Sequence, residues 1–495
     1  GAAVRIAMTV GEAGEQVGQL LQVIKETTNE SRETRDVQLS QRSGKIFANL
    51  AVGANVAGSE KLLANTHISH EGVKLHGKGF IVTIDEAQTL GLGRTPGAEQ
   101  IIRPFRNGRD LTGKPRGDFV IDLFGLEADR VREIYPDVYQ WMLERVKPER
   151  DAKSHTADGA GYAKRWWQFG KPRQELRKAL VGLPCYIATV KTAKHRIFQF
   201  LGPEILPESK LIAIAHFDPV CLGVLSSRLH VLWATAAGSA LGVGNDPTYV
   251  KTKSFEAFPF PILSDEHSQR LGELSARIDA HRKGQQIAYP SLTLTEMYNV
   301  MEKLRAGEEL TDNDQTVNQR GLITTLLADH DELDRITFSA YGWSDLAEQL
   351  VGRPGATTPL PDKSADQAEA EEELLMRLVE LNKQRVQEEA QGMIRWLRPE
   401  YQAPDSIQQQ ADITHRAVAA KSEVVVSKGK ATFPKTIPEQ LRLLREELAQ
   451  RSHTTDSLAE LFKRKPLKSV EEGLKSLVAV GVAEHDPSTG KWHLV

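Results

Sequence analysis

The sequence predicts an α+β protein, in which a mixed region of strands and helices precedes a helical region and a small C-terminal winged-helix-like domain. Short apolar runs rich in β-formers recur as far as residue 262 and are separated by turns. The motif Phe258-Pro259-Phe260-Pro261 closes this region. Beyond it, apolar residues return every three or four positions, as they do in amphipathic helices. Residues 437–495 carry the signals of three helices followed by a hairpin.

The mixed region is expected to contain several strands and one strongly apolar helix. Continuous apolar runs at 119–123, 185–190 and 211–215 predict short buried strands. Alternation around glycines in residues 73–84 predicts strands with tight turns. Residues 220–237 have helical spacing and predict a single helix that ends before a glycine-rich loop.

The opening residues also have the character of a strand. Residues 2–10 are largely apolar, and a natural domain seldom begins inside its own sheet. We therefore expect the chain to have been cut from a longer protein. A natural N-terminal strand at the edge of a sheet is the alternative.

The second half of the chain predicts helices joined by two linkers. Residues 263–350 are expected to form a helical spacer, and residues 351–436 a linker and a long helix. Within the latter segment, residues 352–361 are rich in Pro, Gly and Thr, and the helix runs from an acidic start toward Trp396. Residues 403–432 are polar and weakly patterned, which predicts a second linker.

The C-terminal segment 437–495 is expected to form a winged-helix-like domain. Such a domain binds DNA in some proteins and packs against protein in others. Its third helix carries Glu471 and Glu472 beside Lys475, which is unfavourable for contact with phosphates. Both uses of the domain therefore stay open.

Composition limits the class of protein. The 495 residues are 40% hydrophobic and 26% charged, as in ordinary globular proteins. The net charge of -3 excludes a protein that is basic over its whole surface, so contact with nucleic acid must be local. Two cysteines, Cys185 and Cys221, are too few for a disulfide framework and are typical of a reducing cytosol. With no membrane-length apolar run and no signal peptide, we expect a cytoplasmic protein without a membrane partner.

Sequence motifs for catalysis are missing. The chain has no dinucleotide-binding glycine motif, no phosphate-binding loop and no His-Glu-x-x-His metal motif. Enzymes that methylate the adenine amine need an Asn/Asp-Pro-Pro-Tyr/Phe loop to hold the flipped base. The nearest segment, Asn245-Asp246-Pro247-Thr248-Tyr249, lacks the second proline. We expect no catalytic residue, no metal site and no cofactor site in this chain.

Basic residues concentrate in two stretches. Residues 94–116 hold six basic residues against two acidic ones, and residues 162–196 hold nine against one. The second stretch also contains Trp166 and Trp167. Lysine and arginine neutralise phosphates, and aromatic rings pack on sugars or bases, so both stretches are candidates for DNA contact. The alternative is that the charges form a solvated face and that the tryptophans belong to the core.

Several motifs in order resemble one family. Residues 225–233, Leu-Ser-Ser-Arg-Leu-His-Val-Leu-Trp, followed by Phe258-Pro259-Phe260-Pro261, resemble the target recognition region of large fused adenine-specific DNA methyltransferases. These are the type IIG/IIL restriction–modification enzymes and the methyltransferases of BREX and DISARM phage-defence islands. Segments 102–111 and 166–173 look like further motifs of that region, and 333–343 and 394–401 are similar to the helical tail of the same proteins.

The resemblance implies a division of labour within a longer bacterial protein. An upstream Rossmann-like domain would bind S-adenosylmethionine and methylate adenine N6, and residues 1–20 would be a remnant strand of its sheet. Residues 21–262 would form the DNA target recognition domain, which selects a sequence in double-stranded DNA from the major groove. The implied partners are double-stranded DNA, the missing N-terminal catalytic domain and other subunits of a defence system. Since the catalytic and cofactor motifs are absent, this chain is not expected to methylate DNA by itself.

By similarity, base-contacting positions would fall in the loop 238–253 and near 191–196, and basic residues of the two stretches would hold phosphates. The candidate DNA-binding residues are Arg103, Arg106, Asn107, Arg109, Lys114, Arg116, Trp166, Trp167, Lys171, Arg173, Lys191, Lys194, His195, Arg196, Arg228, Asn245, Tyr249, Lys251 and Lys253.

Two other functions are compatible with the sequence. The helical and winged-helix-like parts could form a protein-interaction scaffold of a defence complex. The chain could also be an enzyme whose site has no known motif.

Overall fold

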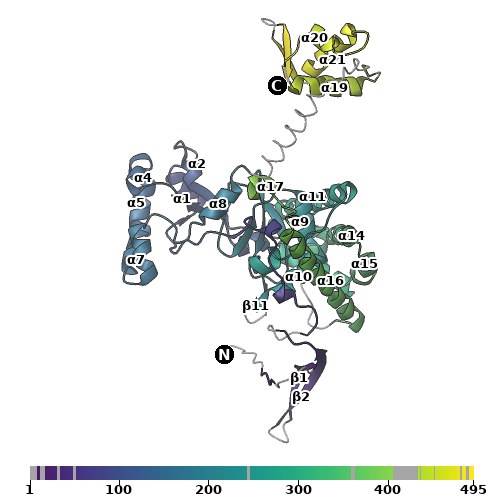
Figure 1. Ribbon diagram of the computed structural model, residues 1–495. Helices are drawn as coiled ribbons and strands as arrows, with labels where there is room; N and C mark the ends of the chain where they lie inside the picture. The colour runs from purple at the N-terminus through teal and green to yellow at the C-terminus, as the bar shows by residue number, and fades with distance from the viewer. Residues whose placement is uncertain are drawn as a thin grey trace. The chain divides into compact units, whose positions relative to one another are not determined.

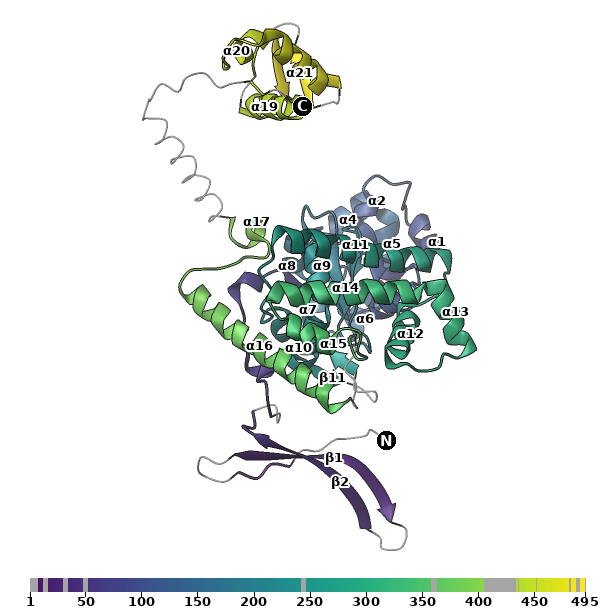
Figure 2. The ribbon, with the colours of Figure 1, turned by 90° about the vertical axis from the view of Figure 1, so that its right-hand side faces the viewer.

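The computed structural model describes residues 8–11, 17–29, 34–47, 52–241, 246–357, 363–404, 433–434, 436–450, 452–479, 482–486 and 490–494. The chain divides into two compact units, Gly1–Pro404 and Asp405–Val495, called here the main unit and the C-terminal unit. Figures 1 and 2 show the elements of each unit from two sides.

Two four-stranded sheets form the centre of the first half of the main unit. The antiparallel sheet has the order β3 (Ser69–Glu71), β10 (Leu211–Ile214), β7 (Tyr186–Val190) and β8 (Phe198–Leu201). The mixed sheet has the order β4 (Ile81–Val82), β6 (Phe119–Ile121), β5 (Ile102–Arg106) and β9 (Leu206–Pro207), and β9 runs parallel to β5. Because β9 leads into β10, residues 206–214 join the two sheets.

Short helices surround the mixed sheet and form a lobe, which Figure 1 shows around α1, α4, α5 and α7. The helices of the lobe are α1 Ile84–Thr89, α2 Ala98–Ile101, α4 Ala128–Ile134, α5 Pro136–Arg145, α6 Lys147–Ala152 and α7 Ala157–Lys164. Helices α3 Gly108–Thr112 and α8 Gln174–Leu180 instead bury Leu111 and Leu176 against the antiparallel sheet. Phe80, Val120 and Met142 lie fully buried in the apolar core of this lobe. The predicted strands at 119–123, 185–190 and 211–215 are confirmed as β6, β7 and β10.

The helix predicted over 220–237 is two helices. Helix α9 (Pro219–Ser226) and helix α10 (Arg228–Ala237) meet at Ser227, whose backbone is extended and whose side chain caps α10 by accepting from the His230 N–H. A serine at this position terminates one helix and starts the next, which the apolar spacing alone does not reveal. Among the described residues, no single helix is long and apolar enough to cross a membrane, although α9 and α10 together, bent by 63°, meet that criterion by length and composition.

The second half of the main unit is helical and shares an apolar cluster with residues of the first half. Its helices are α11 Asp265–Ala288, α12 Leu294–Ala306, α13 Asp312–Gly321, α14 Ile323–Tyr341, α15 Ser344–Leu350, α16 Ala365–Ala390 and α17 Pro399–Gln402. Trp233 and Phe258 from the first half pack in one apolar cluster with Leu274, Leu333 and Leu374 from these helices. The helices therefore pack against the first half of the main unit through α10 and the segment that carries Phe258.

Smaller elements complete the main unit. A long hairpin of β1 (Gly18–Asn29) and β2 (Thr34–Gly44) precedes two 3-10 turns at Val56–Gly58 and Leu63–Asn65. A short hairpin of β11 (Ser239–Leu241) and β12 (Asp246–Thr248) precedes a π-helical turn at Lys251–Phe255. Most of the strand predicted at 2–10 and of the linker predicted at 403–432 lies outside the described residues.

The C-terminal unit has its own core. Helices α19 (Ile437–Gln450), α20 (Thr455–Ala459) and α21 (Leu467–Ala479) precede the hairpin of β13 (Ala483–Asp486) and β14 (Lys491–Leu494). Leu444, Leu474 and Trp492 are buried between them. The predicted order of three helices and a hairpin is present, and the α+β fold class of the chain is confirmed.

Candidate nucleic-acid interface

A basic pocket lies where the two sheets of the main unit join. Its volume is about 550 Å³, and we call it the junction pocket. The residues that line it are Glu71, Lys74, Leu75, His76, Gly77, Lys78, Ile81, Phe105, Asn107, Arg116, Glu149, Lys171, Arg173, Lys191, Glu208, Ser209 and Lys210.

The backbone brings these residues together from distant parts of the chain. Val73 forms a parallel bridge with Glu208, and Lys74 forms an antiparallel bridge with Lys171. Gly72 makes the close approach possible, because a Cβ atom there would lie 2.3 Å from the carbonyl oxygen of Pro207. The pocket is therefore built by pairing between segments that lie about a hundred residues or more apart in the sequence.

Some cations of the pocket are neutralised within the chain. Glu71 accepts hydrogen bonds from Arg173 and, at 2.6 Å, from Lys191. Burial opposes ionisation of the Glu71 carboxyl, but these two cations outweigh it and lower its pKa. Arg116 lies 2.9 Å from Asp110 and 3.1 Å from Asp118.

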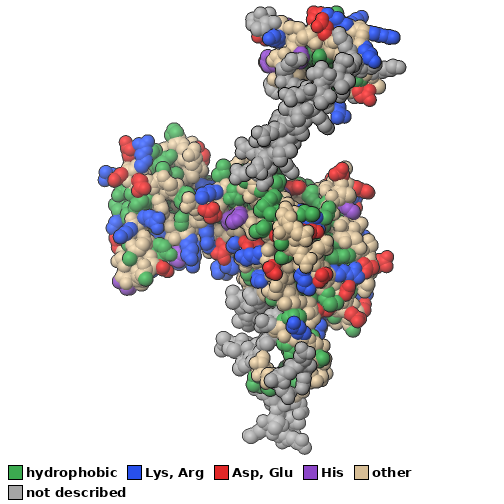
Figure 3. All heavy atoms as spheres, in the orientation of Figure 1, with side chains coloured by type: hydrophobic (Ala, Val, Ile, Leu, Met, Phe, Trp, Pro, Cys, Tyr) green, Lys and Arg blue, Asp and Glu red, His purple; other side chains and the backbone are tan. Residues whose placement is uncertain are grey.

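Other cations have no carboxylate to balance them. In the part of the chain that the structure describes, the ammonium groups of Lys74, Lys78, Lys171 and Lys210 make no hydrogen bond or ion pair, and all four side chains are exposed. Figure 3 shows Lys and Arg side chains gathered where the lobe meets the rest of the main unit. The pocket thus keeps an excess of positive charge that faces solvent, which attracts anions.

The structure brings five of the candidate residues into this pocket. They are Asn107, Arg116, Lys171, Arg173 and Lys191. Asn107 also caps α3, since its side-chain oxygen accepts from the N–H groups of Arg109 and Asp110.

Other candidates remain on the surface or bind within the chain. Arg109 and Lys114 are exposed. Six others bind groups of the chain itself. Four of them donate to backbone carbonyls: Arg103 to those of Pro203 and Glu204, Arg106 to that of Phe105, Trp167 to that of Leu126 and Lys253 to that of Ser59. Arg103 also forms an ion pair with Asp122, Lys194 donates to the Asn299 side chain, and Lys251 donates to the Glu256 side chain. Asn245 lies outside the described residues.

Five candidates are buried, so in this conformation their predicted contact with DNA is corrected to a structural role. Trp166, His195, Arg196, Arg228 and Tyr249 are each at most 8% exposed. Burial lowers the pKa of Arg196 to about 10, and its guanidinium holds the carbonyls of Val190 and Pro247. Arg196 thereby fixes β12 against the end of β7 and positions the loop that the resemblance assigns to base contact.

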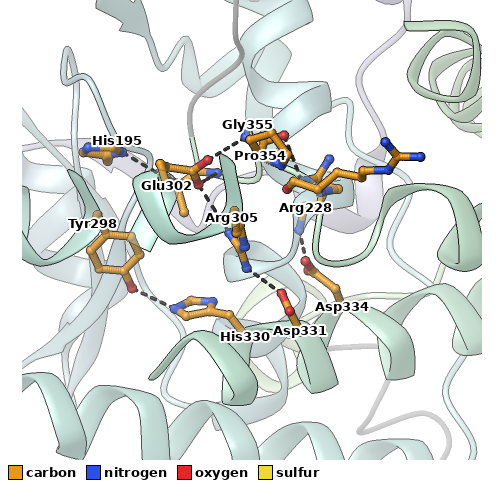
Figure 4. Close-up of polar contacts among 12 residues, drawn as sticks. His195, Arg228, Tyr298, Glu302, Arg305, His330, Asp331, Asp334, Pro354 and Gly355 are labelled. Atoms are coloured by element: carbon orange, nitrogen blue, oxygen red, sulfur yellow. Dashed lines mark hydrogen bonds and ion pairs between the residues drawn. The ribbon is translucent and has the colours of Figure 1, made fainter. Parts of the chain in front are cut away.

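A buried polar network links His195, the neighbour of Arg196, to the helices of the second half of the main unit, as Figure 4 shows. His195 binds Thr357 and Asn299 at 2.9 Å each. Thr357 donates to Glu302 at 3.0 Å, and Glu302 lies 3.3 Å from Arg305.

The same network holds part of the predicted linker 352–361. Arg228 donates to the carbonyls of Arg353 and Pro354, and the Gly355 N–H donates to Glu302. Residues 353–357 are therefore fixed to the core by buried charges.

Three lysines of the pocket were not among the sequence candidates. Lys74 and Lys78 lie in the segment interpreted as strands with tight turns, and Lys210 directly precedes β10. The only sequence signal was the close spacing of Lys74, His76 and Lys78 around Gly77. In the described residues, no group of three or more His, Cys, Asp and Glu side chains is placed to hold a metal ion.

The fold and the pocket define a class: an α+β binding module with an anion-attracting surface at the junction of two sheets. Residues 55–262 match the family model of the target recognition domain of MmeI, which supports a target recognition domain of a restriction–modification enzyme in this segment.

Comparison with solved structures agrees with this assignment at the level of the fold. The chain is similar to the type IIL restriction–modification enzyme MmeI, solved in complex with DNA, with a TM-score of 0.50 and 16% sequence identity. The match covers 71% of this chain and 40% of that enzyme, so this chain spans well under two thirds of its length. No curated protein matches the chain.

Proposed function

We propose that residues 55–262 recognise a sequence in double-stranded DNA for a restriction–modification enzyme. The observation that carries this proposal is the match of this segment to the MmeI target recognition domain. The unpaired lysines of the junction pocket support it, because uncompensated cations on a surface favour the polyanionic backbone of DNA. That the similar enzyme MmeI was solved with DNA is consistent with the same partner here.

We further propose that the complete protein is an S-adenosylmethionine-dependent N6-adenine DNA methyltransferase of restriction–modification or phage defence. In this proposal the recognition segment positions the DNA, and a catalytic domain outside this chain binds S-adenosylmethionine and transfers the methyl group. The resemblance of several ordered motifs supports this view. The chain described here would then contribute sequence selection and no methyl transfer of its own.

A salt titration of duplex binding tests the proposed function. We expect the 495-residue chain to bind a mixed-sequence duplex, with an association constant that falls steeply and log-linearly as salt increases, since bound lysines and arginines release counterions from phosphates. Fluorescence anisotropy between 50 and 300 mM salt measures the slope. Binding that does not change with salt, or no binding at 50 mM, would contradict the proposal.

A further inference from the structure

We propose that the junction pocket holds a single backbone phosphate of bound duplex DNA, shared by Lys74, Lys171 and Lys210. This inference rests on the proposed function and extends it to a specific site. It assigns the anion-binding role to three of the four pocket lysines that have no ion pair in the described chain. It removes Arg173 and Lys191 from that role because Glu71 already neutralises them in part.

The pairing of Lys74 with Lys171 is the first argument. The Lys74 N–H donates to the Lys171 carbonyl at 3.1 Å, and the Lys171 N–H donates to the Lys74 carbonyl at 3.0 Å. Residues paired in this way lie directly opposite each other with their side chains on one face, and like charges in that position repel. No carboxylate within the described residues forms an ion pair with either lysine. A bound anion between the two ammonium groups would relieve this repulsion.

The turn that carries Lys210 is the second argument. The Glu208 carboxylate accepts from the Ser209 hydroxyl at 2.5 Å and from the backbone N–H of Lys210 at 2.8 Å. Its oxygens are thus used to shape the turn, and the Lys210 ammonium has no ion pair in the described chain. A third uncompensated cation therefore lines the same pocket as the lysine pair.

Backbone strain at the wall of the pocket is the third argument. His76 and Arg173 both line it, and both have positive φ angles, 54° and 57°, which residues with side chains rarely adopt. Strained residues of this kind cluster at binding sites, where the surrounding structure holds them in place. The His76 ring stacks on Tyr162 at 4.9 Å, and its Nε2 atom has no hydrogen-bond partner in the described chain.

The shape of the pocket favours a phosphate that belongs to a polymer over a free anion. The side chains of Lys74, Lys171 and Lys210 are exposed, so the site is open to solvent and can admit one phosphate of a long chain. Leu75, Ile81 and Phe105 also contribute to the wall, and apolar groups beside a phosphate site can pack against deoxyribose. We therefore commit to a phosphodiester of duplex DNA as the occupant.

The test compares two triple variants of the full chain in the duplex salt titration. Lys74→Gln, Lys171→Gln and Lys210→Gln together should reduce the slope of log K against log salt by about 0.9, the value for one phosphate, and weaken binding about eightfold at 0.1 M salt. The control, Arg320→Gln, Arg335→Gln and Lys383→Gln, removes three charges from exposed positions of α13, α14 and α16 and should leave the slope unchanged. Thermal unfolding monitored by circular dichroism verifies that both variants fold.

The outcomes separate this inference from the proposed function. A slope reduced by about 2.7 would mean three separate phosphates and would overturn the shared site. An unchanged slope in a chain that binds duplex would reject the pocket and leave DNA recognition intact, whereas a wild-type chain that binds no duplex would reject the proposed function itself. A phosphorus NMR titration with inorganic phosphate tests whether the pocket binds a free phosphate compound instead. That assignment would follow if wild type binds phosphate saturably, the pocket variant does not, and both bind duplex DNA equally.

Discussion

Replacing Arg305 with methionine is expected to lower the free energy of unfolding of the main unit by about 3–5 kcal/mol. The Arg305 side chain is 1% exposed and lies 3.3 Å from Glu302 and 2.7 Å from Asp331. Without it, these carboxylates remain buried with too little positive charge beside them. Removal of one partner from a buried ion pair costs far more than the pair contributes, because the remaining charge has lost both water and its partner.

Urea denaturation of wild type and variant, followed by tryptophan fluorescence, measures this loss. Arg335→Met on α14 is the matched control, since Arg335 is exposed and makes no ion pair among the described residues. The free energy of unfolding of the Arg335→Met variant should differ from that of wild type by no more than about 0.5 kcal/mol. If Arg305→Met is no more destabilising than Arg335→Met, the network of Figure 4 does not stabilise the fold.

His230 is expected to make the main unit sensitive to acid. Burial, together with the nearby Arg196 cation, lowers the pKa of His230 to about 3. The ring lies 4.5 Å from that of Phe258, and its Nε2 atom is 3.0 Å from the Tyr249 hydroxyl. In the unfolded chain the same group takes up a proton near pH 6.5. As the pH falls below 6.5, His230 becomes protonated in the unfolded state but stays neutral in the folded state. The free energy of unfolding therefore decreases.

Between pH 7.5 and pH 5, this single group should cost about 2 kcal/mol of stability. The variant His230→Gln keeps a hydrogen-bonding group near Tyr249 but cannot titrate, so its stability should fall by about 2 kcal/mol less than that of wild type over this range. Other buried histidines, such as His330 with its lowered pKa, contribute equally to both proteins and cancel in the comparison. Parallel stability curves for the two proteins would show that His230 does not titrate as proposed.

The sequence identified those elements whose burial leaves a local pattern. Strand β7 is buried at every position, and so is β10, which is why both appear as continuous apolar runs. The order of elements in the C-terminal unit follows from helix periodicity and turn residues, which are equally local. The break at Ser227 escaped detection, because the apolar residues continue through it with helical spacing.

The candidate site was predicted only in part. Lys171, Arg173 and Lys191 lie in the basic stretch and do line the junction pocket. Lys74 and Lys210 were missed because they stand apart from that stretch and reach the pocket through pairing between distant segments. Arg228 belongs to the motif at 225–233 that resembles the recognition region, whereas the structure leaves it only 2% exposed, with its backbone N–H donating to Asp334.

The sequence by itself determined the fold class, the positions of the main strands and helices, the concentration of basic residues before residue 200 and the likeness to a DNA-recognition family. Tertiary structure alone decided which of those cations remain unpaired. Arg177 is bound by Asp122, and Arg173 by Glu71, across 55 and 102 residues of chain respectively. A count along the chain cannot detect this pairing, because Coulomb attraction depends on distance in space and not on separation in sequence.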